Sequence, residues 1–204
     1  HGFLLSLDPA TTRGAVTATV NLDFPIGKDV PADAFTYAIA ADVTNFGADK
    51  LVPGQKIEAT ALKASATSDG YRIAGDVRIN GTPASVEVVR KKGDADAAVH
   101  LAAKLDEAAR RRLGFDVGSA VAGAIPIRMT ALVGSDVTDE RMAVDADLTP
   151  VKIDDLFPGW EKAAGRPAHA KFTLDKGAKG VHLDNLVIDG SGANVQGTVD
   201  LDTS

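Results

Sequence analysis

The sequence predicts a mainly β protein, an antiparallel sheet with one clear α-helix and short helical turns. Three observations support this fold class. Apolar and polar residues alternate through most of the chain, turn residues separate the alternating segments at short intervals, and only one segment has a pronounced helical pattern. Period-two alternation places successive side chains on opposite faces of a sheet. The pattern leaves open whether the apolar face lines an open groove or the inside of a sandwich.

The expected strands each carry their large apolar side chains on one face. Segments with one apolar and one polar face suit an antiparallel sheet whose polar face meets water. These apolar residues are also the candidates for a binding groove. They are Val16, Val20, Leu22, Ile73, Val77, Ile79, Ile125, Ile127, Met129, Met142, Val144, Leu148, Phe172, Leu174, Val195, Val199 and Leu201.

Turn signals divide the chain into these segments and predict a meander of hairpins. They lie at 8–9, 53–54, 68–70, 80–81, 92–94, 134–136, 176–177 and 189–192. Asn80-Gly81 favours a type I′ hairpin, although Pro83 leads us to expect a loop longer than two residues. Two similar segments, 73–80 and 195–202, each contain a glycine that predicts a bulge or bend.

One helix is predicted over 104–113. Asp106 can cap its start, the arginines at 110–112 suit its C-terminal end, and Gly114 can close it. Leu105, Ala109 and Leu113 share one face, which we expect to pack on the sheet. Shorter helical turns are predicted at 153–157, before Pro158-Gly159, and at 32–35.

Composition restricts the classes of function. Hydrophobic residues make up 45% and charged residues 25%, which is typical of a folded chain. The net charge of −6 makes nucleic acid an unfavourable partner, and the absence of cysteine excludes disulfides and thiolate chemistry. The chain begins within an apolar stretch and without Met, so we expect a segment of a longer protein. We treat 1–204 as one β-rich segment with possible sub-units at 1–102 and 103–204.

Several polar groups were considered as chemical sites. Asp94/Asp96, Asp145/Asp147 and Asp200/Asp202 each place two carboxylates on one strand face, which would suit Ca²⁺, but none lies in a calcium-loop motif, so we expect ordinary turns and strand edges. The four histidines lack metal-ligand spacing, and Ser191 lacks a nucleophile motif. We expect no catalytic residue, no metal and no cofactor.

Two other groups were weighed as contact sites. The basic clusters 90–92 and 110–112 could contact anionic headgroups, or simply be solvated. The aromatic pair Phe157 and Trp160 could cover the groove or contact a partner, although we favour a role in the local core.

Several stretches resemble the AsmA-like envelope proteins, in particular the YhdP/TamB-type bridge-like lipid transfer proteins. The matching stretches are 105–115, 121–127, 147–165 and 183–201, so the resemblance covers roughly the second half of the chain. The first half is similar only in its succession of strands and turns. The resemblance implies an extended, curved sheet folded into an apolar groove, anchored in the inner membrane by an N-terminal helix and reaching across the periplasm.

We therefore expect a non-catalytic segment that binds or conducts phospholipid acyl chains and contributes to phospholipid transport and outer-membrane homeostasis. Acyl chains need apolar area rather than directed polar groups. This expectation requires that no second sheet seals the apolar face. The alternatives are a structural or regulatory scaffold that binds an envelope protein through a strand edge, and an enzyme acting on lipid or glycan.

Overall fold

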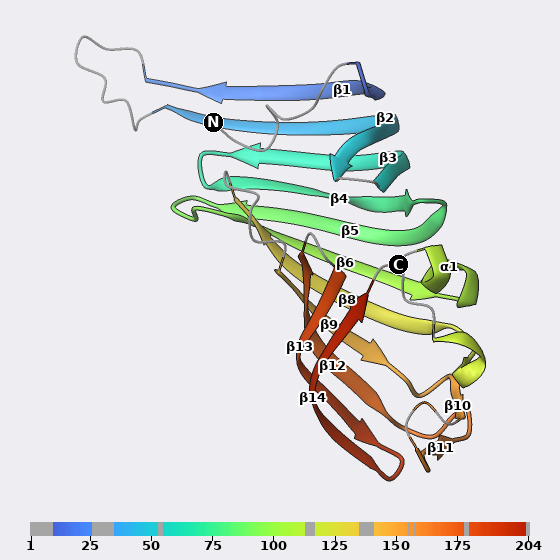
Figure 1. The fold of residues 1–204 in the computed structure, drawn as a ribbon. Coiled ribbons are helices and arrows are strands. Elements are labelled where there is room, and N and C mark those ends of the chain that lie inside the picture. The colour runs from blue at the N-terminus through green and yellow to red at the C-terminus, as the bar shows by residue number, and fades with distance from the viewer. Residues whose placement is uncertain are drawn as a thin grey trace. The chain divides into compact units, whose positions relative to one another are not determined.

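The computed structural model describes residues 10–25, 35–52, 55–112, 117–134, 141–154, 156, 158–177 and 180–202. Eleven strands form an antiparallel sheet that does not close on itself, in the order β1-β2-β3-β4-β5-β6-β8-β9-β12-β13-β14 (Figure 1). They are β1 (Thr12–Asp23), β2 (Thr36–Val52), β3 (Gln55–Thr67), β4 (Gly70–Ile79), β5 (Thr82–Lys91), β6 (Ala97–Leu105), β8 (Ile125–Val133), β9 (Arg141–Asp147), β12 (His169–Gly177), β13 (Gly180–Gly190) and β14 (Ala193–Asp202). The predicted mainly β class is confirmed.

The chain divides into two compact units. Unit 1 comprises the described residues of 1–99 and 133–135, and unit 2 those of 100–132 and 136–204. Unit 1 contains strands β1 to β5, and unit 2 contains most of the strands from β8 to β14 together with the helical residues. The division falls close to the boundary of the two sub-units considered from the sequence.

Strands β2 to β5 follow one another as hairpins, as the turn signals predict, and β1 pairs antiparallel with β2. The β4–β5 turn is a two-residue loop, because Ile79 pairs directly with Thr82. Asn80 and Gly81 both have positive φ, 49° and 80°, which a type I′ turn requires. The prediction of a longer loop was wrong, because Pro83 lies within β5 opposite Arg78. Pro83 follows the closing pair Ile79–Thr82. At this position a residue of β5 donates no N–H hydrogen bond to β4, so a proline is compatible with the pairing.

Several irregularities in register interrupt the sheet, and at three of them a glycine lies opposite or beside the extra residue. Gly14 lies opposite an extra residue of β2 around Asn45, Gly75 beside one of β3, and Gly197 beside one of β13 around Asn185. Asn45 and Asn185 both have a φ of 52°, a conformation that asparagine tolerates better than most residues. The bulges expected at Gly75 and Gly197 are thus present, with the extra residue on the neighbouring strand.

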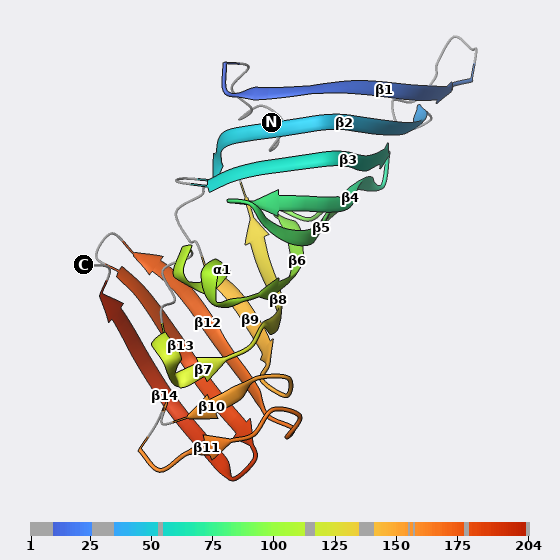
Figure 2. The same cartoon turned by 90° about the vertical axis from the view of Figure 1, so that its right-hand side faces the viewer.

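Unit 2 has a second, smaller layer over one face of its strands. The helix α1 (Glu107–Arg112), the 3₁₀ turn η3 (Gly118–Ala120) and the three-stranded sheet β11-β10-β7 belong to it (Figure 2). The bounds of these strands are β7 (Val121–Ala122), β10 (Lys152–Asp154) and β11 (Glu161–Lys162). Buried side chains of both layers form one core, including Val121, Ile153 and Trp160 from the small layer.

The helix prediction was correct in place but too long at its start. Lys104 and Leu105 belong to β6, and α1 begins after Asp106, whose carboxylate accepts a hydrogen bond from the N–H of Ala109 at 2.7 Å. Leu105 and Ala109 are buried as expected. The helical turn predicted at 153–157 was wrong for its first residues, because Ile153 and Asp154 pair with β11 as strand.

Some sequence predictions lie outside the described residues. These are the turns at 8–9 and 53–54, most of the turn at 134–136, the helical turn at 32–34, and residues Leu113, Gly114 and Phe157.

Candidate functional site

The most extensive apolar surface of unit 1 is one face of the five strands β1 to β5, which we call the β1–β5 apolar face. Residues directly opposite each other in a sheet share a face, so the register defines its rows. Two rows are apolar from edge to edge: Ala18–Ala41–Ala64–Ile73–Val88 and Val16–Val43–Leu62–Gly75–Val86. Five strands at about 4.8 Å spacing give these rows a width of about 19 Å.

The β1–β5 apolar face is built mainly from alanine and valine. At its β1 edge, Val16, Val20 and Leu22 are 65%, 54% and 59% exposed. Toward the middle of the face, Leu62, Val77 and Val88 are buried, while Ile73 and Ile79 are half-buried. In the described part of unit 1, every residue outside the strands lies in a turn or a connecting segment, so no described helix or second sheet of unit 1 lies over this face.

The opposite face of the same strands is polar. One of its rows reads Thr17–Asp42–Lys63–Ala74–Glu87. Ion pairs cross the strands here: Lys63 Nζ lies 3.3 Å from an Asp42 carboxylate oxygen, and Arg72 Nε lies 2.5 Å from Glu87. Lys56 and Arg13 both contact Glu58 and lower the pKa of its carboxyl, the hydrogen bond from Lys56 having the largest effect. The two faces of the sheet therefore differ sharply in polarity.

In unit 2 the corresponding apolar face is partly covered. Ile127 and Leu148 lie in the core beneath the small layer, together with Val151 and Ile153, which are fully buried. Trp160 lies in the same core, and its indole N–H donates to the carbonyl of Ser191 at 3.4 Å. At this end of the face a second sheet does seal the apolar side chains, so Ile127 and Leu148 are core residues and not part of an open surface.

Farther along the strands, a second group of apolar side chains surrounds Val144 and Leu174. Met129, Val144 and Phe172 are direct cross-strand neighbours on β8, β9 and β12. Other sequence candidates on this face are half-buried; they are Ile125, Met142, Val195 and Val199. Leu201 lies in β14 opposite Val181.

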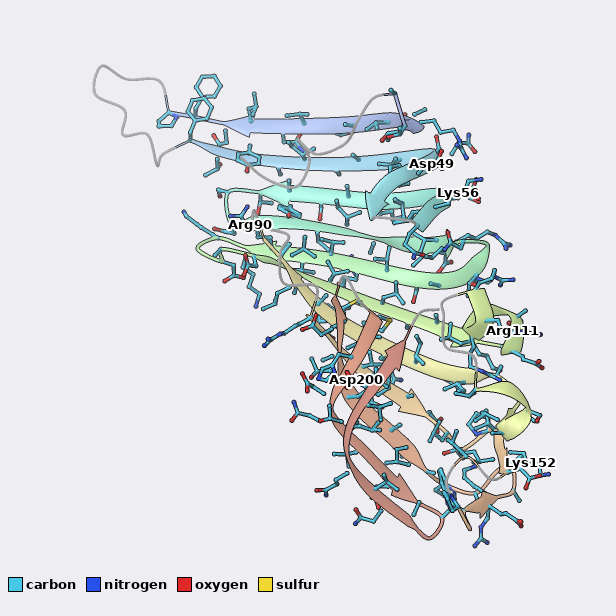
Figure 3. All side chains as sticks on the ribbon, in the orientation of Figure 1. Asp49, Lys56, Arg90, Arg111, Lys152 and Asp200 are labelled. Carbon is cyan, nitrogen blue, oxygen red and sulfur yellow. The ribbon has the colours of Figure 1, made fainter. Side chains whose placement is uncertain are left out.

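Two cations are buried in unit 2, which the sequence analysis did not foresee. Arg110, 4% exposed, donates to the carbonyls of Leu105, Gly123 and Val121 at 3.1, 2.7 and 2.7 Å. This residue was expected on a solvated helix face or at a headgroup, whereas it joins α1 to the segment around β7. Its neighbour Arg111 is exposed and pairs with Glu107 at 3.1 Å (Figure 3).

Lys162 is the second buried cation. Its ammonium group donates to the carbonyls of Val151, Ala163 and Thr149 at 2.7, 3.2 and 3.3 Å. Burial lowers the pKa of Lys162, and the negative charge of Asp147 opposes this effect. Lys162 thereby holds β11 against the turn that leads into β10.

His182 lies among carboxylates on the polar face of unit 2. Its Nδ1 contacts the carboxylate of Asp200 on β14, which Figure 3 labels, and its Nε2 lies 3.1 Å from that of Asp184. Asp175 of β12 is its direct neighbour on the other side and contacts Arg141 at 3.7 Å. The hydrogen bond with Asp200 has the largest effect and raises the pKa of His182; desolvation opposes it, and the charges of Asp184 and Asp200 add to the rise. The sequence analysis noted only that the histidines lack metal-ligand spacing and missed this cluster.

The remaining polar candidates have structural partners. Asp145 lies 3.6 Å from Lys171. A hydrogen bond from the side chain of Thr149, followed by the one from its N–H at 2.9 Å, lowers the pKa of the Asp147 carboxyl. Ser191 lies in the β13–β14 turn and donates to the carbonyl of Pro167. Across the described residues, no group of three or more His, Asp or Glu side chains is placed to hold a metal ion.

Comparison with known proteins adds no further constraint. No protein-family model, no curated protein and no solved structure matches this chain. Within the described ranges, no helix has both the length and the apolar character needed to cross a bilayer.

Proposed function

We propose that the β1–β5 apolar face binds the acyl chains of phospholipids. The observation that carries this proposal is the pair of uninterrupted apolar rows across five strands, with no described layer of unit 1 over them. An exposed apolar surface of this kind marks an interaction site more often than a free surface. An acyl chain is a suitable occupant because the rows offer apolar area and no directed polar group.

The energetics are favourable for a chain of ordinary length. Each methylene group removed from water contributes about 0.8 kcal/mol, so ten buried methylenes contribute about 8 kcal/mol before the cost of immobilising the lipid. Alanine and valine side chains are short and leave space above the strands. The polar opposite face, with its cross-strand ion pairs, keeps that side hydrated.

The covered end of unit 2 does not belong to the proposed binding surface. Ile127 and Leu148 are already buried against the small layer, so a lipid chain would have to displace that layer to reach them. Val144 and Leu174 are also buried, so the proposed binding surface is confined to unit 1. Among the sequence candidates, those of unit 1 carry the proposal furthest.

The wider role we propose follows from the resemblance to AsmA-like envelope proteins. In that setting the chain is a non-catalytic segment of a larger periplasmic protein, anchored in the inner membrane, that conducts phospholipid and supports outer-membrane homeostasis. This part of the proposal rests on the sequence resemblance and on the polarity of the two faces.

The acyl-chain proposal is tested with two matched double variants on β1. Val16→Asp/Val20→Asp places two charges on the apolar face, and Thr17→Asp/Thr19→Asp places two charges on the polar face of the same strand. All four positions are exposed, so neither variant disturbs a core. After incubation with zwitterionic phospholipid vesicles, native mass spectrometry should find phospholipid adducts on the wild type and the threonine variant, and few on the valine variant. A wild type without adducts, or equal losses in both variants, would contradict the proposal.

The scaffold alternative is favoured by a different observation, the edge of β1 with which no described strand pairs. A protein partner could add a strand at that edge without using the apolar face. A stable protein complex that forms equally well with the Val16→Asp/Val20→Asp and Thr17→Asp/Thr19→Asp variants, with no lipid adduct on the wild type, would favour this alternative.

A further inference from the structure

The strand β1 is an edge of the eleven-stranded sheet: among the described strands, β2 alone pairs with it. Its segment 15–22 contains no charged residue and no proline, and alternates small or branched apolar residues with threonine and asparagine. Side chains on both of its faces are exposed along the whole segment. Such a segment combines the backbone groups of an open edge with high β-propensity.

Natural edge strands usually carry a feature that blocks pairing with another chain, such as a charge, a proline or a bulge. The other edge of the sheet, β14, has such features: Gly197 weakens the strand, and Asp200 is charged and 79% exposed. In β1 the charged Arg13 and Asp23 lie only near its ends. The two edges therefore differ, and β1 is the one open to strand addition.

We propose that β1 pairs antiparallel with β1 of a second copy of this chain, about a two-fold axis through Thr19. In this register Val16 faces Leu22 of the second copy and Ala18 faces Val20. On the other face, Thr17 faces Asn21. In this register apolar residues lie opposite apolar residues, and polar residues lie opposite polar ones. The apolar residues of both copies therefore fall on the same face of the joined sheet.

The sequence of β1 favours its own copy as the occupant of the edge. The pairing is self-complementary in polarity, as an isologous two-fold contact requires. It brings no like charges together, since Asp23 falls opposite Ala15. The most exposed apolar side chains of the strand, Val16 and Leu22, gain each other as neighbours across the seam. The proposal needs no lipid, and its result is independent of the acyl-chain proposal.

Sedimentation of the purified chain in lipid-free buffer, over a wide range of concentration, tests the pairing. We expect a dimer of the wild type. Thr19→Lys places two ammonium groups opposite each other on the axis, so this variant should be monomeric. The matched control is Thr198→Lys, an exposed threonine of the β14 edge, which should leave the dimer intact. A monomeric wild type, or equal dissociation in the two lysine variants, would overturn the proposal.

Single cysteines test the register without relying on a charged substitution. The chain has no cysteine, so Thr19→Cys introduces one thiol, which lies on the axis beside its own copy. Mild oxidation should link the Thr19→Cys variant as a dimer, and a mixture of Thr17→Cys and Asn21→Cys should link as a heterodimer. Thr198→Cys serves as the control. Efficient linkage of Thr198→Cys with none of Thr19→Cys would show that β1 is not the paired edge.

Discussion

Arg110 and Lys162 place two positive charges in the core of unit 2, where main-chain carbonyls surround them. A buried charge is tolerated only when its hydrogen-bonding groups are satisfied. Each cation also gathers carbonyls from segments that are separate in the chain. Their role in the structure is therefore to join the pieces of the small layer, which are too short to hold together by strand pairing alone.

Replacing Arg110 by methionine should destabilise unit 2. The change removes the donors of three carbonyls and leaves those oxygens buried, which costs about 2–4 kcal/mol. Trp160 is the only tryptophan and lies in the same core, so its fluorescence during urea titration reports on this unit. The control is Arg111→Met, whose exposed ion pair contributes about 0–1 kcal/mol. Equal effects of the two substitutions would contradict the assigned role of Arg110.

His182 should make the stability of unit 2 depend on pH. Asp200 and Asp184 raise the native pKa of His182 above its ordinary value of 6.5. A raised native pKa means that the charged ring stabilises the folded state fully below about pH 6.5 and that this contribution is lost as pH rises through the native pKa. Asp175 and Arg141 also face this row.

The measurement compares wild type with His182→Gln by urea titration at several pH values. The stability advantage of the wild type should be largest at mildly acid pH and shrink as the solution becomes alkaline. Asp200→Asn, which removes the main cause of the shift, should reduce the same advantage. A difference between wild type and His182→Gln that does not change with pH would count against the cluster.

At the scale of single elements, the long strands were predictable and the short ones were not. In β1, β4 or β9 the alternation extends over seven residues or more, and in β4 and β9 burial of one face reinforces it. Strands β7, β10 and β11 have two or three residues each, too few to show a period. Their conformation depends on tertiary contacts such as those of Ile153, and a helical turn was predicted there instead.

The bulge at Asn185 explains why the His182 cluster was missed. Counting outward from the Gly190↔Ala193 pair, an unbroken ladder would place His182 opposite Leu201. The extra residue shifts the register by one, so that His182 meets Asp200 on the polar face. The sequence contains only a weak signal for this bulge, Asn185 on β13 and Gly197 on the neighbouring β14. A single asparagine does not suffice to locate a bulge.

The contribution of the small layer can be measured through Ile153. This side chain is fully buried between β10 and the strands of the larger sheet. Ile153→Ala should lower the free energy of unfolding by about 2–5 kcal/mol, because it leaves a cavity in the core. The matched control is Val187, on the exposed side of β13. Val187→Ala should change the free energy of unfolding by about 0.5 kcal/mol or less. A small effect at Ile153 would mean that the layer contributes little to the stability of unit 2.

At the scale of the whole molecule, the candidate site depends on a property that the sequence does show, the difference between two faces. The alternation identified the apolar residues of β1, β4, β8 and β9, and the register joins those of unit 1 into the rows that carry the acyl-chain proposal. What the sequence does not show is which parts of the face are covered. Covering depends on the small layer, whose elements have no pattern of their own, so Ile127 and Leu148 looked no different from Ile73 and Val77.

The acyl-chain proposal and headgroup binding by the basic residues at 90–92 make opposite predictions about salt. The chain has a net charge of −6, so long-range electrostatics do not favour anionic lipid, and only a local cluster could attract it. Raising the salt concentration from about 0.1 M to about 1 M shortens the screening length from about 10 Å to about 3 Å, whereas burial of apolar surface does not depend on this screening.

We therefore expect phospholipid uptake to survive high salt and to be similar for zwitterionic and anionic vesicles. The variant Arg90→Gln/Lys91→Gln/Lys92→Gln should bind as the wild type does, and native mass spectrometry after each incubation measures the adducts. Uptake confined to anionic vesicles, lost at high salt and lost in this variant, would instead assign binding to the basic cluster. In that event the apolar rows would need another occupant, and the paired edge of β1 would be the first place to look for it.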